Sequence, residues 1–504
     1  MMRSLYSGVA GLKTHQTKMD VIGNNIANTN TAGFKSSSVN FSDTFYQTIS
    51  GASGANAETR TAGTNAKQIG LGSMVAAIQT NITEQGGPST TNRALDVAIN
   101  GDSFLIVRSG NDTCFTKSGA LNVDNDGNLY CTTNGATVQG WLTDGKGNII
   151  KDTVKDLKVM SPDNQYYPPE ATGSATVSGN LDPNDPDVDL STGKGEIVTV
   201  SFYDKIGDSY TIKLSVKQAG DVATGAVTAG AYTVSVVDVL NSSSESIFVK
   251  KTVDANGVAT YASTGAEFKF GSKQGVYTVD QNTGELTWTT AAAETLSFST
   301  SDGNFVSVTP ARKREGYEGA INFSITKDAN GLEGDKTTFP QYTDTTETGG
   351  LNIFFDSLTQ YSQGGTSKLS SSKGDKDNLN GGNTAGKMKG ISTDQEGKIW
   401  GSYDNDMKLC LGQMAVATFA NPSGLESVGT SLFAATLNSG EFDGVGQEIS
   451  LDGGSFTVGA LEMSNVDLAN EFTQMITTQR GFQANSRIIT TSDSMLEELV
   501  NLKR

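Results

Sequence analysis

An apolar residue recurs at every seventh position at both ends of the chain. Near the N-terminus these residues are Leu5, Leu12, Met19 and Ile26, and near the C-terminus they are Leu468, Met475, Phe482, Ile489 and Leu496. A seven-residue spacing predicts α-helices with a narrow apolar stripe, as in coiled coils. The second position of each heptad is often polar, as at Gln16 and Gln479. Each stripe is too thin for a self-sufficient bundle, so we expect these side chains to complete their burial against other copies of the chain.

The two helices are predicted to occupy residues 1–33 and 465–504. The first ends in an Asn-rich stretch, with Gly33 as its stop. Either Ser464 or Asn465 can serve as the N-cap of the second, because both side chains accept hydrogen bonds from free backbone amides. If these terminal helices pair, the first and last segments of the chain meet, and the domains between them in the sequence are nested.

Between the predicted helices, the pattern changes to short alternating runs cut by turns such as Asp126-Gly127, which is typical of β-hairpins. Prolines between Pro162 and Pro186 mark a boundary within this region. The fold class is therefore predicted to be α+β and multidomain, with a terminal coiled coil and nested all-β domains. The predicted parts are an extended connector over 34–70, an inner β-domain over 71–165 and 346–450, an inserted outer β-domain of one or two modules over 166–345, and a connector over 451–464. The Gly- and Ser-rich residues 362–386 are predicted to be a flexible loop.

Composition excludes several classes of protein. The chain has 504 residues and a formal net charge of −18, which argues against a nucleic-acid partner. It lacks an apolar run of eighteen residues, so no membrane insertion is expected, and its N-terminal segment lacks the apolar core of a signal peptide. Three scattered cysteines, Cys114, Cys131 and Cys410, are too few for a disulfide framework and are expected in the core.

Candidate catalytic and metal-binding residues are scarce. His15 is the only histidine, which excludes a catalytic triad with histidine or a site with two histidine ligands, and we expect it on the protein surface. Residues 124–128 have glycine at the fourth place, not at the sixth as in a calcium loop, and fit a hairpin turn better. Phosphate-binding loops, dinucleotide fingerprints and nucleophile elbows do not occur in the sequence. We therefore predict a non-enzymatic protein without metal or cofactor.

Four motifs resemble those of a known family. The run NNIANTNTAGFK at 24–35 resembles the N-terminal signature of bacterial flagellar rod, hook and hook-associated proteins, and residues 466–502, with RGF at 480–482, resemble its C-terminal partner. Residues 95–119 and 419–425 resemble the two halves of the hook β-domain. The resemblance covers residues 1–160 and 345–504, and the length of the chain favours the hook branch over the shorter rod subunits.

This resemblance implies a structural subunit that assembles into the curved, flexible tube of the flagellar hook and transmits torque from rod to filament as a universal joint. The helices would line a central channel, and the inserted β-domain would form the outer surface. The implied partners are other copies of the chain, rod proteins, the hook cap, hook–filament junction proteins and the flagellar export gate. A missing signal peptide by itself indicates a cytoplasmic protein. The resemblance implies instead that the chain leaves the cell through the flagellar type III apparatus without a cleaved signal.

Two sets of polar residues near the helices have open interpretations. One set either stops the first helix or makes polar contacts between subunits. Its members are Asn24, Asn25, Asn28 and Asn30. The second set, Arg480 and Arg487, either pairs with carboxylates such as Asp20 of an adjacent copy or is solvated. 

Phe41 and Phe45 also have two interpretations. They form the export-gate motif that the resemblance implies, or they are packing neighbours four residues apart. Alternatives for the whole chain also remain on the sequence alone. It could be another axial flagellar protein of the distal rod or hook-associated group, a β-rich surface adhesin with oligomerising terminal helices, or a secreted enzyme with a β-solenoid or sandwich core.

Overall fold

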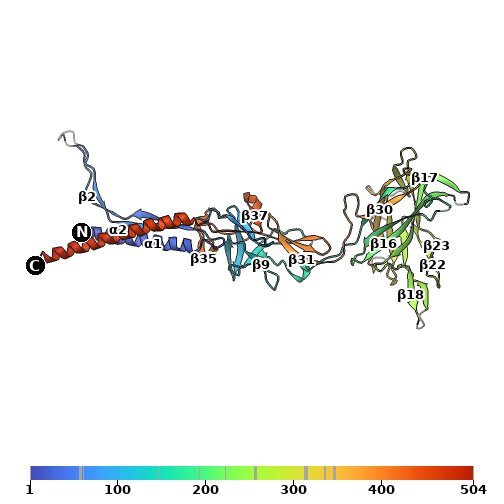
Figure 1. The fold of residues 1–504 in the computed structure, drawn as a ribbon, viewed down its shortest axis with the longest axis horizontal. Coiled ribbons are helices and arrows are strands. Elements are labelled where there is room, and N and C mark those ends of the chain that lie inside the picture. The colour runs from blue at the N-terminus through green and yellow to red at the C-terminus, as the bar shows by residue number, and fades with distance from the viewer. Residues whose placement is uncertain are drawn as a thin grey trace. The chain divides into compact units, whose positions relative to one another are not determined.

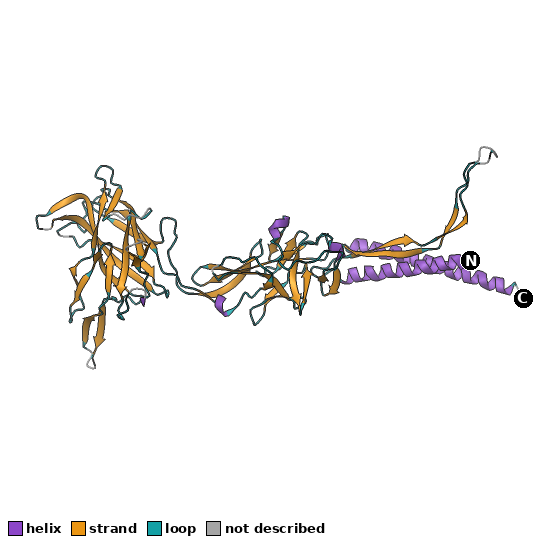
Figure 2. Ribbon diagram, turned by 180° about the vertical axis from the view of Figure 1, so that it is seen from behind, coloured by secondary structure: helices purple, strands orange, loops and turns teal. Residues whose placement is uncertain are grey.

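A computed structural model shows two compact units that draw on interleaved parts of the chain. Unit 1 comprises residues 1–165, 388–403 and 408–504, and unit 2 comprises residues 166–387 and 404–407. The structure describes residues 2–502 apart from 56–59, 61, 146, 192, 222, 255–257, 311–315, 334–335 and 344–347. Both long helices belong to unit 1, and strands make up most of the rest (Figure 2). The predicted fold class, α+β with terminal helices and nested β-domains, is confirmed.

Two α-helices form one end of unit 1. They are α1 (Met2–Ala27) and α2 (Leu468–Asn501), and they lie side by side (Figure 1). The pair is antiparallel, because Gly8 approaches Ile489 while Asn25 is hydrogen-bonded to Glu471. Both chain ends therefore lie at the same end of the helix pair.

The N-cap of α2 is Asp467, so the prediction of Ser464 or Asn465 is wrong. The Asp467 carboxylate accepts hydrogen bonds of 2.9 and 3.3 Å from two backbone amides of the first turn, which have no partner within the helix. The Asn465 amide is already engaged, since it donates to the carbonyl of Asn81 at 2.9 Å. Asn465 therefore anchors the start of α2 to a loop and leaves the capping to Asp467.

The segment predicted as a connector forms two antiparallel ribbons. β1 (Ser37–Asp43) pairs with β4 (Ser73–Thr80) and lies against α1, and β2 (Tyr46–Ser50) pairs with β3 (Lys67–Gly70). Every residue of β2 and β3 is exposed, and this ribbon projects away from the helices (Figure 2). A ribbon without a buried face does not need to alternate apolar and polar residues, which explains why the sequence predicted only an extended connector here.

The inner β-domain of unit 1 is assembled from both halves of the chain. β11 (Thr137–Leu142) pairs with β33 (Lys408–Met414), and buried residues from both halves, such as Leu105 and Met414, share one core. Other strands of this sheet include β7 (Phe104–Ser109), β8 (Asp112–Thr116), β9 (Leu121–Val123), β10 (Leu129–Cys131), β12 (Lys155–Asp156), β31 (Gly386–Thr393), which pairs with β32 (Lys398–Tyr403), β34 (Val416–Ala417), β35 (Glu426–Gly429) and β36 (Leu432–Ala434). All three cysteines are buried in this domain, as predicted.

Two small antiparallel ribbons join the inner β-domain to the start of α2. β5 (Pro88–Thr90) pairs with β38 (Ala460–Glu462), and β6 (Val97–Asn100) pairs with β37 (Ser455–Val458). Each ribbon combines a strand from the first hundred residues with a strand from the last fifty. The domain therefore cannot be completed without the C-terminal part of the chain.

Unit 2 is an all-β body with two sheets around one core. The first sheet contains β14 (Ser174–Asn180), β20 (Glu267–Phe270), β21 (Lys273–Gln274), β26 (Ala320–Lys327), β29 (Leu351–Thr359) and β30 (Lys368–Lys373). The second contains β15 (Glu196–Tyr203), β16 (Ser209–Asp221), β17 (Ala226–Leu240), β24 (Ala293–Phe298) and β25 (Phe305–Thr309). Three smaller ribbons pair β18 (Val249–Val253) with β19 (Ala259–Ser263), β22 (Val276–Val279) with β23 (Leu286–Thr290), and β27 (Tyr342–Thr343) with β28 (Thr348–Gly349). In addition, β13 (Tyr166–Tyr167) pairs with the first residues of β31 (Gly386–Thr393). One buried cluster, which includes Phe202, Phe268 and Phe323, connects both sheets, so the insert is a single module.

The predicted end of the insert at residue 345 differs from the structure. Both β29 and β30 pair with β14, so unit 2 continues to Lys387, and the second half of unit 1 starts at Met388 and not at residue 346. The prediction of a flexible loop over 362–386 is wrong for β30. Its serines looked like linker residues, yet Ser370 is hydrogen-bonded to Ser178 of the next strand at 3.1 Å. Polar cross-strand contacts hold this strand, and composition alone does not reveal them.

Candidate assembly interface

Small and polar residues fill the contact between α1 and α2, which we call the helix seam. A Cβ atom at Gly11 would lie 2.6 Å from the side-chain Nδ2 atom of Asn485, and a Cβ atom at Gly481 would lie 2.8 Å from the His15 ring. Glycine at these positions allows the two backbones to approach closely. The buried residues among those described in the two helices are Gly8, Gly11, Thr14, Ile22, Asn25, Glu471, Thr478 and Ser492, and of these only Ile22 has a large apolar side chain. The seam therefore depends on close fit and polar contacts more than on apolar burial.

Asn25 holds the two helices and β1 together. Its Nδ2 atom donates to Oε1 of Glu471 at 3.1 Å and to the carbonyl of Ser37 at 2.8 Å, and its Oδ1 atom accepts from the Ser37 amide at 3.0 Å. The residue is only 1% exposed. In the single chain the side chain of Asn25 is therefore already engaged within its own subunit, in place of the contact between subunits that the sequence predicted.

The other predicted polar residues lie on the outside. Asn28 donates to the side chain of Asn24 at 3.0 Å, a contact within the last turn of α1. The side chains of Asn24 and Asn30 are exposed, as are those of Arg480 and Arg487 in α2. These residues are available to a second copy of the chain.

The sequence predicted that His15 lies on the free surface, but the structure places it elsewhere. It sits in the helix seam beside Gly481, and the Phe41 ring of β1 meets it edge-on with 5.8 Å between ring centroids. Burial, together with the charge of Lys18, lowers the pKa of His15 below 6.5. A neutral imidazole is thus favoured where α1, α2 and β1 meet.

The predicted heptad residues are only partly covered by the chain itself. The structure leaves Leu468 41% exposed. The other predicted stripe residues are half-buried: Leu5, Leu12, Met19, Ile26, Met475, Phe482, Ile489 and Leu496. Other apolar side chains at these two ends of the chain are exposed to a greater extent. Together with Leu468 they form what we call the exposed apolar set. Its members are Tyr6, Val9, Leu468, Phe472, Ile476, Ile488, Met495, Leu499, Val500 and Leu502.

Phe41 and Phe45 are in different environments. Phe41 packs against His15 and lies 5.9 Å below the Lys18 ammonium, whereas Phe45 is 86% exposed at the base of the projecting ribbon. Phe45 therefore has no packing role that would account for an aromatic residue at this position.

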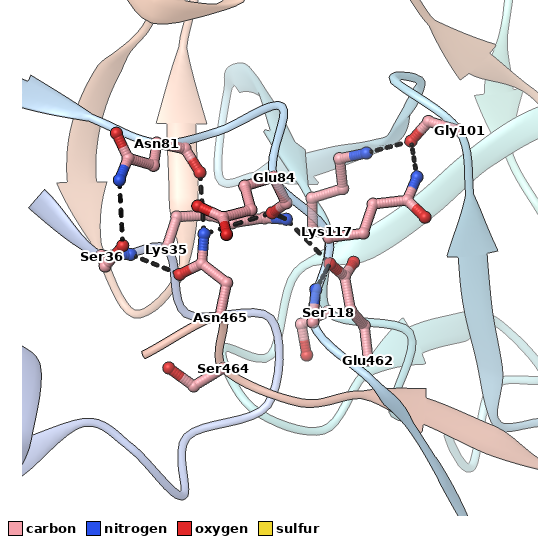
Figure 3. A network of polar contacts seen from close by, with 12 residues as sticks. Lys35, Ser36, Asn81, Glu84, Gly101, Lys117, Ser118, Glu462, Ser464 and Asn465 are labelled. Carbon is pink, nitrogen blue, oxygen red and sulfur yellow. Dashed lines mark hydrogen bonds and ion pairs between the residues drawn. The ribbon is translucent and has the colours of Figure 1, made fainter. Parts of the chain in front are cut away.

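A buried ion pair fastens the helices to the inner β-domain (Figure 3). The Nζ atom of Lys35 lies 2.7 Å from Oε1 of Glu462, and the two side chains are 1% and 3% exposed. Lys35 also donates to the carbonyl of Glu84 at 2.7 Å, and the Gly86 amide donates to Oε1 of Glu462 at 3.1 Å. We call the set formed by residues 33–36, 84–86, 101, 117 and 462–465 the joint.

Lys117 places a second buried ammonium in the joint. Its Nζ atom donates to the carbonyl of Gly101 at 2.6 Å and lies 4.9 Å from the centroid of the Phe104 ring. Burial lowers the pKa of Lys117 to about 8, although the Glu462 carboxylate opposes the shift. The sequence analysis missed Lys117 and Glu462 as special positions. Lys35 and Lys117 do occur inside the quoted motifs, and this was the available signal.

Comparisons with known proteins agree with this architecture. Family profiles described as "Flagella basal body rod protein", "Flagellar hook protein FlgE/F/G D1 domain" and "Flagellar basal body rod FlgEFG protein C-terminal" match residues 5–35, 98–224 and 457–502. The chain is 35% identical to the flagellar hook protein FlgE of Borreliella burgdorferi, with 100% of both chains covered. This chain belongs to the flagellar hook protein FlgE family. The resemblance stated from the sequence motifs is confirmed.

Other members and neighbours of the FlgE family extend the comparison. The chain is 33% identical to FlgE of Treponema pallidum and 27% identical to the flagellar basal-body rod protein FlgG of Bacillus subtilis, each with 100% of both chains covered. A crystal structure of Helicobacter pylori FlgE2 aligns with a TM-score of 0.32 at 12% identity and covers 74% of this chain and 100% of that chain. Among the described residues, neither α1 nor α2 is apolar enough over its length to cross a membrane.

Proposed function

We propose that this FlgE-family chain is the structural subunit of the flagellar hook and that its polymerisation, without catalysis, is its function. The observation that carries the proposal is the exposed apolar set on α1 and α2, in which Phe472 is 51% and Ile476 is 59% exposed. Full burial of one such side chain contributes about 1.5–3 kcal/mol. Contacts that cover several of them in each subunit therefore supply a substantial driving force for assembly.

A second copy of the chain is the partner that fits this surface. The helix seam is built from glycines and polar groups, so the closure of one helix pair leaves the apolar side chains of both helices uncovered. Sister chains present the same thin stripes and cover them by coiled-coil packing. Repetition of such a heterologous contact produces a helical polymer. The exposed Arg480 and Arg487 would add polar contacts to neighbouring copies.

The remaining family properties are part of the same proposal. Inner contacts between helices would hold the tube together while unit 2, with its charged and turn-rich surface, would allow outer contacts to adjust as the hook bends and transmits torque. Export through the flagellar type III apparatus would use Phe41 and Phe45 at the export gate. Rod proteins, the hook cap and junction proteins would be the partners at the two ends of the polymer.

A rod subunit is the second candidate, because FlgG of Bacillus subtilis matches over the full length of both chains. Negative-stain microscopy of the purified, polymerised chain distinguishes the candidates. Curved tubes support the hook subunit, and straight, rigid tubes support the rod subunit. Monodisperse oligomers or isolated stalks at concentrations far above those needed for polymerisation would contradict both and favour an adhesin.

A further inference from the structure

A cavity of about 520 Å³ lies within unit 2, and we call it the unit 2 cavity. Its walls come from stretches that are distant in the sequence, chiefly the start of β17, the turn between β24 and β25, and the residues that follow β29. Pockets that bind small molecules usually measure about 300–1,000 Å³. All described lining residues belong to unit 2, so the cavity does not depend on the terminal helices.

Backbone contacts hold the walls of the unit 2 cavity in place. The Gln360 amide donates to the carbonyl of Gly303 at 2.7 Å, and the Gly303 amide donates to the carbonyl of Ser299 at 2.9 Å. The Tyr361 amide donates to Oδ1 of Asn180 at 2.7 Å. These bonds tie the residues after β29 to the turn between β24 and β25 and to β14. The walls are therefore preformed, which lowers the entropic cost of binding a ligand.

Tyr361 provides an aromatic surface in the cavity wall. Its hydroxyl donates to Oδ1 of Asn304 at 3.2 Å, and a Cβ atom at Gly303 would lie 2.9 Å from its ring, so the turn supports the ring. Tyr361 is nevertheless 45% exposed. A ring that is held in place and partly uncovered loses little conformational freedom when an apolar face of a ligand packs against it.

Tyr232 also lines the cavity, although it is only 1% exposed. Its hydroxyl accepts a hydrogen bond from Nε2 of Gln360 at 3.2 Å. The hydroxyl has a proton to donate as well, and the described residues provide no acceptor for it. Burial raises the pKa of Tyr232 to about 12, so the hydroxyl keeps this proton at neutral pH. A buried donor without a partner is unfavourable, and an oxygen atom of a ligand would satisfy it.

Two side-chain amides add acceptors to the lining. Nε2 of Gln218 donates to the carbonyl of Pro183 at 2.7 Å, and Nε2 of Gln360 donates to Tyr232. Within the described part of the chain, no donor is bonded to the Oε1 atom of either glutamine. Hydroxyl groups complete the polar lining, and they belong to Thr228, Ser299, Thr300, Ser301 and Ser362. The cavity thus combines neutral donors and acceptors with an aromatic ring.

The charge of the lining decides which ligands fit. Lysine, arginine and histidine do not occur among the described lining residues, so a phosphate or carboxylate ligand would have no cationic partner. Hydrogen bonds from Ser299 and Asn304 lower the pKa of Asp302, which is therefore negatively charged and repels anions. A single carboxylate is also a poor site for a divalent cation. A neutral molecule that is rich in hydroxyl groups matches this lining.

We propose that the unit 2 cavity binds a neutral saccharide. The apolar C–H face of a sugar ring packs against Tyr361. The sugar hydroxyls donate to the amide oxygens of Gln218 and Gln360, and a sugar oxygen accepts the proton of Tyr232. The inference goes beyond the assembly of the hook and concerns unit 2 alone, so it holds whether or not the chain polymerises.

Isothermal titration calorimetry of the unpolymerised full-length chain tests the proposal. Cellotriose and chitotriose are neutral probes, and trigalacturonate carries a carboxylate on every ring. At least one neutral trisaccharide should bind saturably to a single site, and trigalacturonate should bind at least about tenfold more weakly. Hydrogen exchange of the complex should slow only in peptides from 226–232, 299–304 and 359–362. Absence of saturable binding by both neutral probes, or protection only in other peptides, would overturn the proposal.

Two exposed tyrosines of unit 2 give a matched pair of variants. Tyr361→Ala should weaken binding of the neutral trisaccharide at least about tenfold, because the stacking surface is lost. Tyr166→Ala removes a tyrosine that is 58% exposed outside the cavity, so its affinity should equal that of the unmodified chain. Ala229→Trp fills the cavity from an exposed position and should abolish binding with Tyr361 still in place. Equal affinities of all variants would show that the saccharide binds elsewhere and would contradict the proposal.

The competing occupant of the unit 2 cavity is a segment of a neighbouring copy. Hydrogen exchange of the polymer without saccharide distinguishes the two occupants. If the cavity peptides are protected in the polymer, and neither neutral trisaccharide binds the unpolymerised chain, the cavity is a subunit contact and the proposal is wrong.

Discussion

The Lys117 ammonium lies 4.9 Å from the centre of the Phe104 ring, in a place from which water is almost excluded. Cation–π attraction and the hydrogen bond to Gly101 offset part of the cost of burying this charge, yet burial still lowers the pKa of Lys117 from 10.5 to about 8. In the unfolded chain the lysine keeps its proton up to about pH 10.5. Between pH 8 and 10 the unfolded state binds more protons than the folded state, so the free energy of unfolding of unit 1 should rise with pH.

The Lys117→Met variant removes the buried charge and keeps most of the side-chain volume. We expect the free energy of unfolding of unit 1 at pH 7 to increase by about 2–3 kcal/mol, and the rise between pH 8 and 10 to flatten. Urea unfolding should be followed by tryptophan fluorescence in a Trp288→Phe background, because Trp141 and Trp400 then report on unit 1. Lys155→Met, at a lysine that is 56% exposed, serves as the control. A loss of stability in Lys117→Met would show that the charge stabilises the joint.

Gly86 and Gly87 provide a matched test of packing at the joint. A Cβ atom at Gly86 would lie 1.9 Å from the carbonyl oxygen of Met463, which is backbone and cannot rotate away, whereas a Cβ atom at Gly87 would meet nothing within 4 Å. Gly86→Ala should destabilise unit 1 by roughly 1–3 kcal/mol, and Gly87→Ala should be close to neutral. The same fluorescence assay measures both. Equal effects would mean that the loop moves freely relative to the start of α2.

Ile476 tests the assembly surface without disturbing the subunit. Because the residue is 59% exposed, Ile476→Ser should leave the circular dichroism and melting of the monomer unchanged. The critical concentration for polymerisation should rise by tenfold or more, since about 1.5–3 kcal/mol of apolar burial per contact is lost. Sedimentation of the polymer gives this concentration, and Thr477→Ser at an exposed neighbour is the control. Polymerisation at an unchanged concentration would place the interface elsewhere.

Phe45 is a better test of the export motif than Phe41. Phe41→Ala removes a contact with the His15 ring, so a change in export could reflect a change in folding. Phe45 is 86% exposed, and Phe45→Ala should reduce the amount of secreted chain severalfold while the purified protein melts at the same temperature. Tyr46→Ala, at a 55% exposed neighbour, should be secreted normally. Equal secretion of both variants would remove the motif from the mechanism of export.

His15 gives a local probe of the helix seam, because it is the only histidine of the chain. Its NMR signal should titrate below pH 6.5, since burial and the Lys18 charge both lower its pKa. The unfolded chain then binds more protons than the folded chain around pH 6, so the helix pair should become less stable as the pH falls through this range. Lys18→Met should move the titration back toward pH 6.5. A titration at or above 6.5 in the unmodified chain would mean that the seam is open.

Sequence patterns were most informative where the signal was local. The heptads at residues 5–26 and 468–496 predicted both helices, and short alternating runs between them predicted strands, because the burial of one face repeats at the period of the element. Prediction failed where polar residues formed structure. Ser370 and its neighbours resemble a linker in composition but form β30, and Asn465 resembles a cap but binds the carbonyl of Asn81. In these cases the partner lies far away in the sequence.

The sequence by itself determined the class of the protein, the two terminal helices and the absence of catalytic motifs, since periodicity, composition and short motifs are properties of neighbouring residues. Only the tertiary structure decided which sides of the helices face each other: glycines at 8, 11 and 481 bring the backbones together and leave apolar side chains uncovered. It also decided that Lys35 pairs with Glu462, because a contact across 427 residues leaves no pattern in either segment and exists only when both ends of the chain are folded together.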